Sequence, residues 1–111
     1  MEFFVNTMKP GKDTRILDVG GYSWHWRGSG VESRITLLNL RTLEKDSLKG
    51  DGQFEFVEGD ATDMSFDDDS FDLVYSNSVI EHLFNYGNQT AFAEETRRVG
   101  KRYWICLLYT S

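Results

Sequence analysis

Short apolar runs, each followed by small or polar residues, constrain the fold of this 111-residue chain more than any other feature. The runs are Arg15–Val19, Arg34–Leu40, Phe54–Glu58, Phe71–Tyr75 and Arg102–Leu108. Runs of this length, bounded by glycine or polar clusters, indicate β-strands. Because helical or turn-rich connections separate them, the pattern predicts an α/β fold with a parallel sheet covered by helices.

The connections between these runs carry the helical signals. A short helix is expected within residues 22–30, one or two helical turns within 41–48, and the start of a helix at 79–84. The clearest helix is Asn88–Val99, in which the first residue can act as an N-cap and apolar residues recur three or four positions apart. Gly100 is expected to end that helix.

Length and charge restrict the class of protein. A chain of 111 residues predicts one domain, residues 1–111. Its formal net charge of −6 argues against a nucleic-acid-binding surface, which requires clustered Lys and Arg. We therefore expect no nucleic acid among the partners and consider a small-molecule enzyme compatible with this charge.

Cysteine and histidine content restricts the possible sites further. The single cysteine, Cys106, excludes an intrachain disulfide and a Cys-based metal site. Two histidines, His25 and His82, are too few for a zinc site without carboxylate ligands, so we expect no metal. No apolar run approaches the roughly 20 residues that a membrane-spanning helix needs. A cytoplasmic protein without a membrane segment is expected.

Small or polar residues follow four of the predicted strands. They occupy positions 18–21, 39–40, 59–61 and 76–78. In an open parallel α/β sheet, ligands bind beyond the carboxyl ends of the strands. Each set alone is compatible with ordinary turn chemistry, but four sets at the same end of one sheet predict a ligand site.

The first of these sets lacks the signature of a dinucleotide-binding loop. That signature, G-x-G-x-x-G, lets the backbone approach a pyrophosphate, whereas the run from Gly20 reads G-G-Y-S-W-H. No Gly-Lys-Ser/Thr follows either, so a phosphate loop is not indicated. A ligand without phosphates fits this loop better, and a nicotinamide-binding protein is disfavoured.

Four segments together resemble class I S-adenosylmethionine-dependent methyltransferases of the methyltransferase type 11 kind. They read ILDVGG, LLNL, EGDATDMSFDDDSFDLVYSNSVIEHL and EETRRVGKRYWI, and the resemblance covers most of residues 14–105. It implies a Rossmann-like parallel sheet with helices on both faces and strand order 3-2-1-4-5. It also implies S-adenosylmethionine as cofactor and methyl transfer to an acceptor, which we expect to be a small molecule.

The resemblance assigns the first half of the cofactor site to the first two strands. Gly20 and Gly21 would let the backbone pass close to the methionine part and the ribose, and Asp18 would brace their loop. The family usually has an acidic residue at the end of the second strand, where this chain has Asn39, followed by Leu40. An amide can bond the ribose hydroxyls but lacks the strength of a carboxylate.

The other assignments fall on the third and fourth strands. Asp60 would accept a hydrogen bond from the adenine amino group, with Ala61 beside the ring. Asn77 would lie near the methionine end of the cofactor. His82 is a candidate general base, but the sequence favours a local hydrogen bond in the first turn of a helix. The catalytic residue thus stays unknown, and methyl transfer by positioning alone needs no protein nucleophile.

Aromatic residues stand where the family usually has further glycines. A ring face attracts a cation such as a sulfonium, so Tyr22 is counted with the cofactor-binding residues, although packing is an equal alternative. For Trp24 and Trp26 the sequence favours packing under the loop, as core or lid.

The last residues depart from the family pattern. The ending CLLYTS replaces the usual loop, and we expect a fragment that lacks the C-terminal strands of the full fold. The fifth strand would then be an apolar edge, which predicts self-association through Tyr103–Tyr109. The alternative to an enzyme is a catalytically inactive module that binds the cofactor or a nucleoside.

Overall fold

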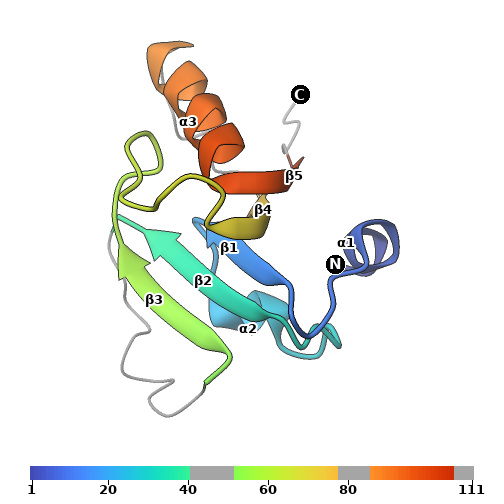
Figure 1. Cartoon of the computed structure of the whole chain (residues 1–111). Coiled ribbons are helices and arrows are strands. Elements are labelled where there is room, and N and C mark those ends of the chain that lie inside the picture. Colours follow the sequence, from blue (N-terminus) through green and yellow to red (C-terminus); the bar gives the residue numbers. More distant parts are fainter. Residues whose placement is uncertain (41–51, 78–85, 107–111) are drawn as a thin grey trace, which may run out of the picture.

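The computed structural model describes residues 1–40, 52–77 and 86–106 (Figure 1). The helical turns predicted within 41–48 and at 79–84, and with them His82, lie outside the described residues. So do the last residues of the predicted fifth strand.

A five-stranded parallel sheet forms the centre of the molecule, in the order β3-β2-β1-β4-β5. This confirms the predicted fold class and strand order. The strands are β1 (Arg15–Val19), β2 (Arg34–Asn39), β3 (Phe54–Glu58), β4 (Phe71–Asn77) and β5 (Gly100–Cys106). β2 ends one residue earlier than predicted, β4 extends two residues further, and β5 begins two residues earlier.

Helices cover both faces of the sheet. They are α1 (Glu2–Met8), α2 (Ser23–Trp26) and α3 (Tyr86–Val99). α2 is the short helix expected within residues 22–30. It ends before Arg27, whose backbone is extended, and Gly28 and Gly30 beyond it adopt positive φ angles of 79° and 82°, which are incompatible with a helix. α3 begins two residues before the predicted start.

α1 is an element that the sequence patterns did not predict. It ends at Lys9, which has a left-handed φ of 48° and precedes Pro10. Phe4 is its buried residue and makes edge-to-face contacts with three rings, at centroid distances of 5.7 Å to Trp26, 4.9 Å to Tyr75 and 5.7 Å to Trp104. α1 therefore joins β4, β5 and α2 into one aromatic cluster.

The alternation of side chains along β1 divides the core into two clusters. Ile16 belongs to the cluster under α1 and α2, together with Leu37 and Leu73. Leu17 belongs to the cluster on the other face, where Phe92 and Val99 of α3 pack. Side chains of successive strand residues point to opposite faces, so β1 is buried on both sides and reads as an uninterrupted apolar run around Asp18.

The register brings the carboxyl ends of β1, β2, β3 and β4 to one edge. Val19 pairs with Leu38 of β2 and Ser76 of β4. Two loop amides continue the pairing beyond the strands, with 2.7 Å from Gly20 N to the Leu38 carbonyl and 2.9 Å from Gly59 N to the Asn39 carbonyl. The starts of the loops after β1 and β3 are thereby fixed to the end of β2, at the edge where the sequence predicted a ligand site.

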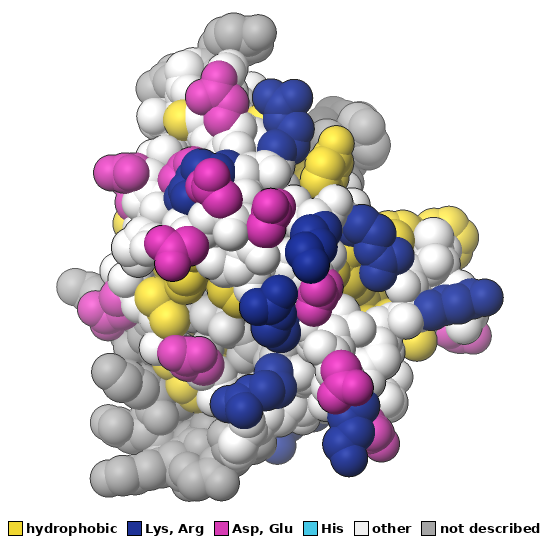
Figure 2. All heavy atoms as spheres, in the orientation of Figure 1, with side chains coloured by type: hydrophobic (Ala, Val, Ile, Leu, Met, Phe, Trp, Pro, Cys, Tyr) yellow, Lys and Arg dark blue, Asp and Glu magenta, His cyan; other side chains and the backbone are white. Residues whose placement is uncertain are grey.

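The surface on the face shown in Figure 2 carries interspersed acidic and basic side chains.

Candidate functional site

A pocket of about 170 Å³ lies at the carboxyl ends of β1 and β4. Its lining comes from the end of β1, the loop that follows it, α2 and the end of β4. The lining residues are Asp18, Gly20, Gly21, Tyr22, Trp24, His25, Tyr75 and Asn77. The pocket thus stands where the sequence placed a ligand.

Five of the nine predicted cofactor residues line this pocket, namely Asp18, Gly20, Gly21, Tyr22 and Asn77. The others lie at the ends of β2 and β3. Among these, Leu40 is 80% exposed and makes no part of the pocket wall.

Asn39 stabilises a residue of the pocket wall, Gly21, through a hydrogen bond. Its side-chain Nδ2 donates a 2.9 Å hydrogen bond to the carbonyl oxygen of Gly21. The residue predicted to hold ribose hydroxyls therefore also fixes the glycine loop, a role that a carboxylate could not take because it has no N–H to donate.

Asp60 and Ala61 lie in the loop after β3. The Oδ1 atom of Asp60 accepts hydrogen bonds from the backbone N–H of Thr62, at 2.8 Å, and from its hydroxyl, at 2.7 Å. The Thr62 hydroxyl, above all, lowers the pKa of Asp60, so this exposed carboxyl is ionised at neutral pH. Ala61 is partly buried against the cluster under α3.

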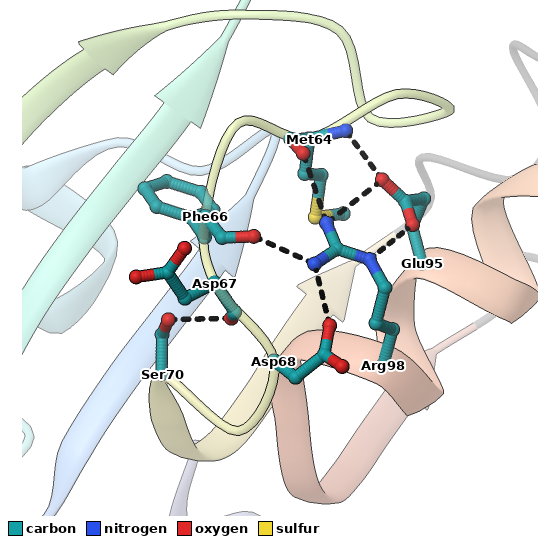
Figure 3. A network of polar contacts seen from close by, with 7 residues as sticks. All are labelled: Met64, Phe66, Asp67, Asp68, Ser70, Glu95 and Arg98. Carbon is teal, nitrogen blue, oxygen red and sulfur yellow. Dashed lines mark hydrogen bonds and ion pairs between the residues drawn. The ribbon is translucent and has the colours of Figure 1, made fainter.

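A partly exposed ionic network holds this loop to α3 (Figure 3). Arg98 donates to the carbonyl oxygens of Met64, at 2.9 Å, and Phe66, at 2.7 Å. It also pairs with Asp68 at 2.9 Å and with Glu95 at 2.7 Å. Glu95 in turn accepts from the Met64 N–H at 2.6 Å, and its pairing with Arg98 lowers its pKa. One guanidinium thereby orders the chain that leads from Asp60 to β4.

Asp18 is the most unusual group in the pocket wall. It is 1% exposed, and burial raises its pKa to about 7. Its Oδ2 atom accepts a 2.6 Å hydrogen bond from the indole N–H of Trp26, whereas Oδ1 is buried and has no hydrogen-bond partner within the described chain. A buried carboxyl oxygen without a partner is costly, and it marks a position where a bound donor or cation would be stabilised.

The two glycines of the loop are required for different reasons. Gly20 has a φ of 80°, in the left-handed region that favours glycine. At Gly21 a Cβ atom would stand 1.7 Å from Oδ2 of Asp18, so no other residue fits without displacing the carboxylate. The loop backbone thus packs directly on Asp18.

The aromatic residues of the loop divide into an anchor and an exposed pair. Trp26 is 2% exposed, which confirms its predicted packing in the core. Trp24 is 68% exposed and lines the pocket, so it is not a core residue, and the alternative expectation that it acts as a lid stays a prediction. Its ring is parallel to that of Tyr22, with an interplanar angle of 10° and a centroid distance of 6.4 Å.

His25 and Tyr75 are pocket residues that sequence reasoning missed. The imidazole Nε2 and the Tyr75 hydroxyl are 2.9 Å apart, although the residues are 50 positions apart in the chain. Partial burial lowers the pKa of His25, so its ring is neutral at pH 7, and burial raises the pKa of Tyr75 far above neutral. Both groups therefore act as uncharged hydrogen-bonding partners.

Two further properties of the described residues concern metal binding and membrane insertion. Within residues 1–40, 52–77 and 86–106, no three His, Cys, Asp or Glu side chains are placed to hold a metal ion. In that same part of the chain, each helix is too short or too polar to cross a membrane.

Comparison with known proteins agrees with the fold and the motifs. A model of the methyltransferase domain family matches residues 18–105, and the chain therefore belongs to this family. No curated protein matches the sequence significantly.

Several solved structures share the fold. A chain from the complex of the Haloferax volcanii Trm112 methyltransferase activator is similar with a TM-score of 0.74 and 21% identity, over 93% of this chain and 49% of that one. The PH0226 protein of Pyrococcus horikoshii is similar with a TM-score of 0.72 and 25% identity, over 93% of this chain and 53% of that one. Geranyl diphosphate C-methyltransferase of Streptomyces coelicolor is similar with a TM-score of 0.68 and 19% identity, over 90% of this chain and 41% of that one. The chain spans about half the length of these structures.

Proposed function

We propose that this chain binds S-adenosylmethionine and forms the cofactor-binding half of a methyltransferase that acts on a small molecule. The observation that carries the proposal is the pocket at the ends of β1 and β4, in which Gly21 packs on a buried, half-unpaired Asp18. The family match supports the same activity. So does the Streptomyces coelicolor enzyme, whose structure contains S-adenosyl-L-homocysteine.

The chemistry of the pocket fits a cofactor that carries positive charge and no phosphate. The unpaired Oδ1 of Asp18 can accept from an ammonium group, and the ring face of Tyr22 attracts a cation. No Lys or Arg stands among the described lining residues, so a phosphate would find no counter-charge. When bound, S-adenosylmethionine supplies a methyl group activated on a sulfonium.

The chain's own residues would then divide the work along the sheet edge. Gly20 and Gly21 leave room for the ligand against the backbone, and Asn39 keeps their loop in place. Asp60, ionised and ordered by Thr62, would accept from the adenine amino group. Asn77, an exposed pocket residue, would face the methionine end. No further catalytic group is required, because alignment of the acceptor with the methyl group supplies much of the acceleration in methyl transfer.

Calorimetry with S-adenosylhomocysteine tests the proposal. Asp60→Ala should weaken binding by about two- to tenfold, which corresponds to one lost hydrogen bond. Asp63→Ala is the matched control, because this exposed carboxyl lies in the same loop but is not assigned to adenine. Absence of binding at millimolar ligand would overturn the proposal, and equal effects of the two variants would overturn the adenine assignment.

An inactive cofactor-binding module is the second candidate. Radiolabelled methyl transfer to an acceptor separates it from the enzyme, because the module binds the cofactor and transfers nothing. The role of His82 and a cytoplasmic location belong to the proposal as predictions.

A further inference from the structure

The acceptor-facing part of the pocket has a composition of its own. After the residues assigned to the cofactor are set aside, three side chains remain in the wall: Trp24, His25 and Tyr75. Trp24 and His25 come from α2 and Tyr75 from β4, so the three converge from separate elements. They adjoin Asn77, which is assigned to the methionine end where the methyl group would be transferred.

Packing in the core does not account for the position of Trp24. It is 68% exposed, on a helix of four residues whose hold on the core is Trp26. Its ring is kept in place by the parallel ring of Tyr22 and by an edge-to-face contact with His25 at a centroid distance of 6.1 Å. A large, oriented apolar ring at a pocket rim is a typical feature of a binding surface.

His25 and Tyr75 supply hydrogen bonding beside this ring. Because their shared bond uses Nε2 of one and the hydroxyl of the other, the pair retains both donor and acceptor capacity for a third group. The nearest acid in the wall is Asp18, and the described lining residues contain no Lys or Arg. An anionic acceptor would therefore meet no compensating charge, whereas a neutral hydroxyl would find a partner.

We propose that Trp24 and the His25–Tyr75 pair form the acceptor subsite, and that the acceptor is a planar aromatic molecule with a neutral hydroxyl group. The ring stacks on Trp24, and the hydroxyl bonds to the His25–Tyr75 pair beside the methionine end of the cofactor. This inference rests on the proposed function, because it is the methyl acceptor that the subsite would hold.

The test uses 4-methylphenol as probe and follows the imidazole proton signals by NMR. His25 and His82 are the two histidines of the chain, so His25→Phe assigns the signals. The His25 signal should shift saturably with 4-methylphenol. Toluene, which lacks the hydroxyl, and 4-methylbenzoate, which replaces it with an anionic carboxylate, should bind more weakly.

Three variants divide the subsite into its parts. Trp24→Ala should weaken 4-methylphenol binding by about two- to twelvefold, the range of an aromatic pair. Tyr103→Ala, which removes a 53% exposed ring on β5 that does not line this pocket, should leave binding unchanged. Tyr75→Phe removes one hydroxyl and should reduce the preference for 4-methylphenol over toluene.

Titrations with and without S-adenosylhomocysteine separate the two proposals. If the probe binds as described but the nucleoside does not bind, the proposed function fails and the aromatic subsite stands as a binding site without its acceptor role. If the nucleoside binds and the probe does not, the inference alone fails. Equal affinity for 4-methylphenol and 4-methylbenzoate, or equal effects of Trp24→Ala and Tyr103→Ala, would also overturn it.

Discussion

The indole N–H of Trp26 donates a 2.6 Å hydrogen bond to the buried carboxyl of Asp18. The bond ties α2 to β1 eight residues earlier and leaves the second carboxyl oxygen without a partner in the described chain. The stability of the fold and the state of the pocket are therefore linked through one acidic group.

Asp18 should make the fold less stable as the pH rises. Burial raises its pKa from 3.8 to about 7, so between these values the folded chain holds a proton that the unfolded chain has lost. Across this window Asp18 should lower the free energy of unfolding by up to about 1.4 kcal/mol per pH unit. Asp18→Asn removes this titration and keeps an acceptor for Trp26. Urea unfolding at several pH values from 4.5 to 7.5 measures the free energy of unfolding of the wild type and of Asp18→Asn.

The difference between wild type and Asp18→Asn isolates the effect, because His25 has a lowered pKa and titrates with the opposite sign in the same pH range. The variant should gain stability relative to wild type as the pH rises. A constant difference across the range would show that Asp18 is ionised throughout.

Gly21→Ala should disrupt the pocket from its floor. A Cβ atom there would lie 2.1 Å from Cγ of Asp18, and overpacking of this kind costs about 1–3 kcal/mol. We expect both the free energy of unfolding and the affinity for S-adenosylhomocysteine to fall. Gly52→Ala, where no atom lies within 4 Å of the added carbon, should change neither. Wild-type affinity in Gly21→Ala would contradict the observed contact.

Asn39→Asp should separate stability from ligand binding. The change removes the donor of the 2.9 Å bond to the Gly21 carbonyl, a loss of about 0.5–1.5 kcal/mol of stability. It also introduces a carboxylate, which bonds ribose hydroxyls more strongly than an amide does. The melting temperature should fall while calorimetry shows tighter binding of S-adenosylhomocysteine. A drop in both would place Asn39 in support of the loop alone.

Arg98→Met should loosen the loop between β3 and β4. The variant removes the donors to the Met64 and Phe66 carbonyls and leaves Glu95 without its ion pair. We expect faster amide exchange in residues 59–70 and a lower urea midpoint, whereas Arg97→Met, a change of the neighbouring exposed residue, serves as control. Protection of the loop equal to that of wild type would count against the network.

The edge strand β5 should promote self-association. Within the described residues β5 pairs with β4 alone, and Tyr103 is 53% exposed. A charge on such an edge discourages strand pairing, so Tyr103→Lys should lower the sedimentation coefficient at high concentration. Leu40→Lys changes an apolar residue that is even more exposed, at 80%, and lies away from β5, so it should have no such effect. A monomeric wild type at all concentrations would refute the prediction.

The strands of the sheet were predictable because neighbouring residues in the sequence are enough to identify each of them. Each strand is a short apolar run with punctuation at its end, and the order of the strands followed from the family resemblance. α1 escaped prediction because its pattern is weak over seven residues, Glu2–Met8, and its stability comes from Phe4 meeting rings distant in sequence.

The site was predictable only where backbone geometry dominates. Gly20 and Gly21 could be located because glycine marks a close approach, and Asp18 because it belongs to the polar set at the end of the first strand. His25 and Tyr75 could not, since their 2.9 Å contact depends on a partner 50 residues away. Trp24 and Trp26 are chemically identical in the sequence, and only the direction of a four-residue helix makes one an anchor and leaves the other exposed.

The contacts of Phe4 have a practical consequence for anyone who tags this protein. Phe4 contacts the rings of Trp26 and Tyr75. Trp26 in turn hydrogen-bonds to Asp18, and Tyr75 hydrogen-bonds to His25. The first helix is thus connected, through one intervening side chain each, to two polar groups that line the pocket. A fusion or deletion at the amino terminus is therefore a change to the ligand site. Affinities measured on differently tagged versions should be compared only when their first eight residues are the same.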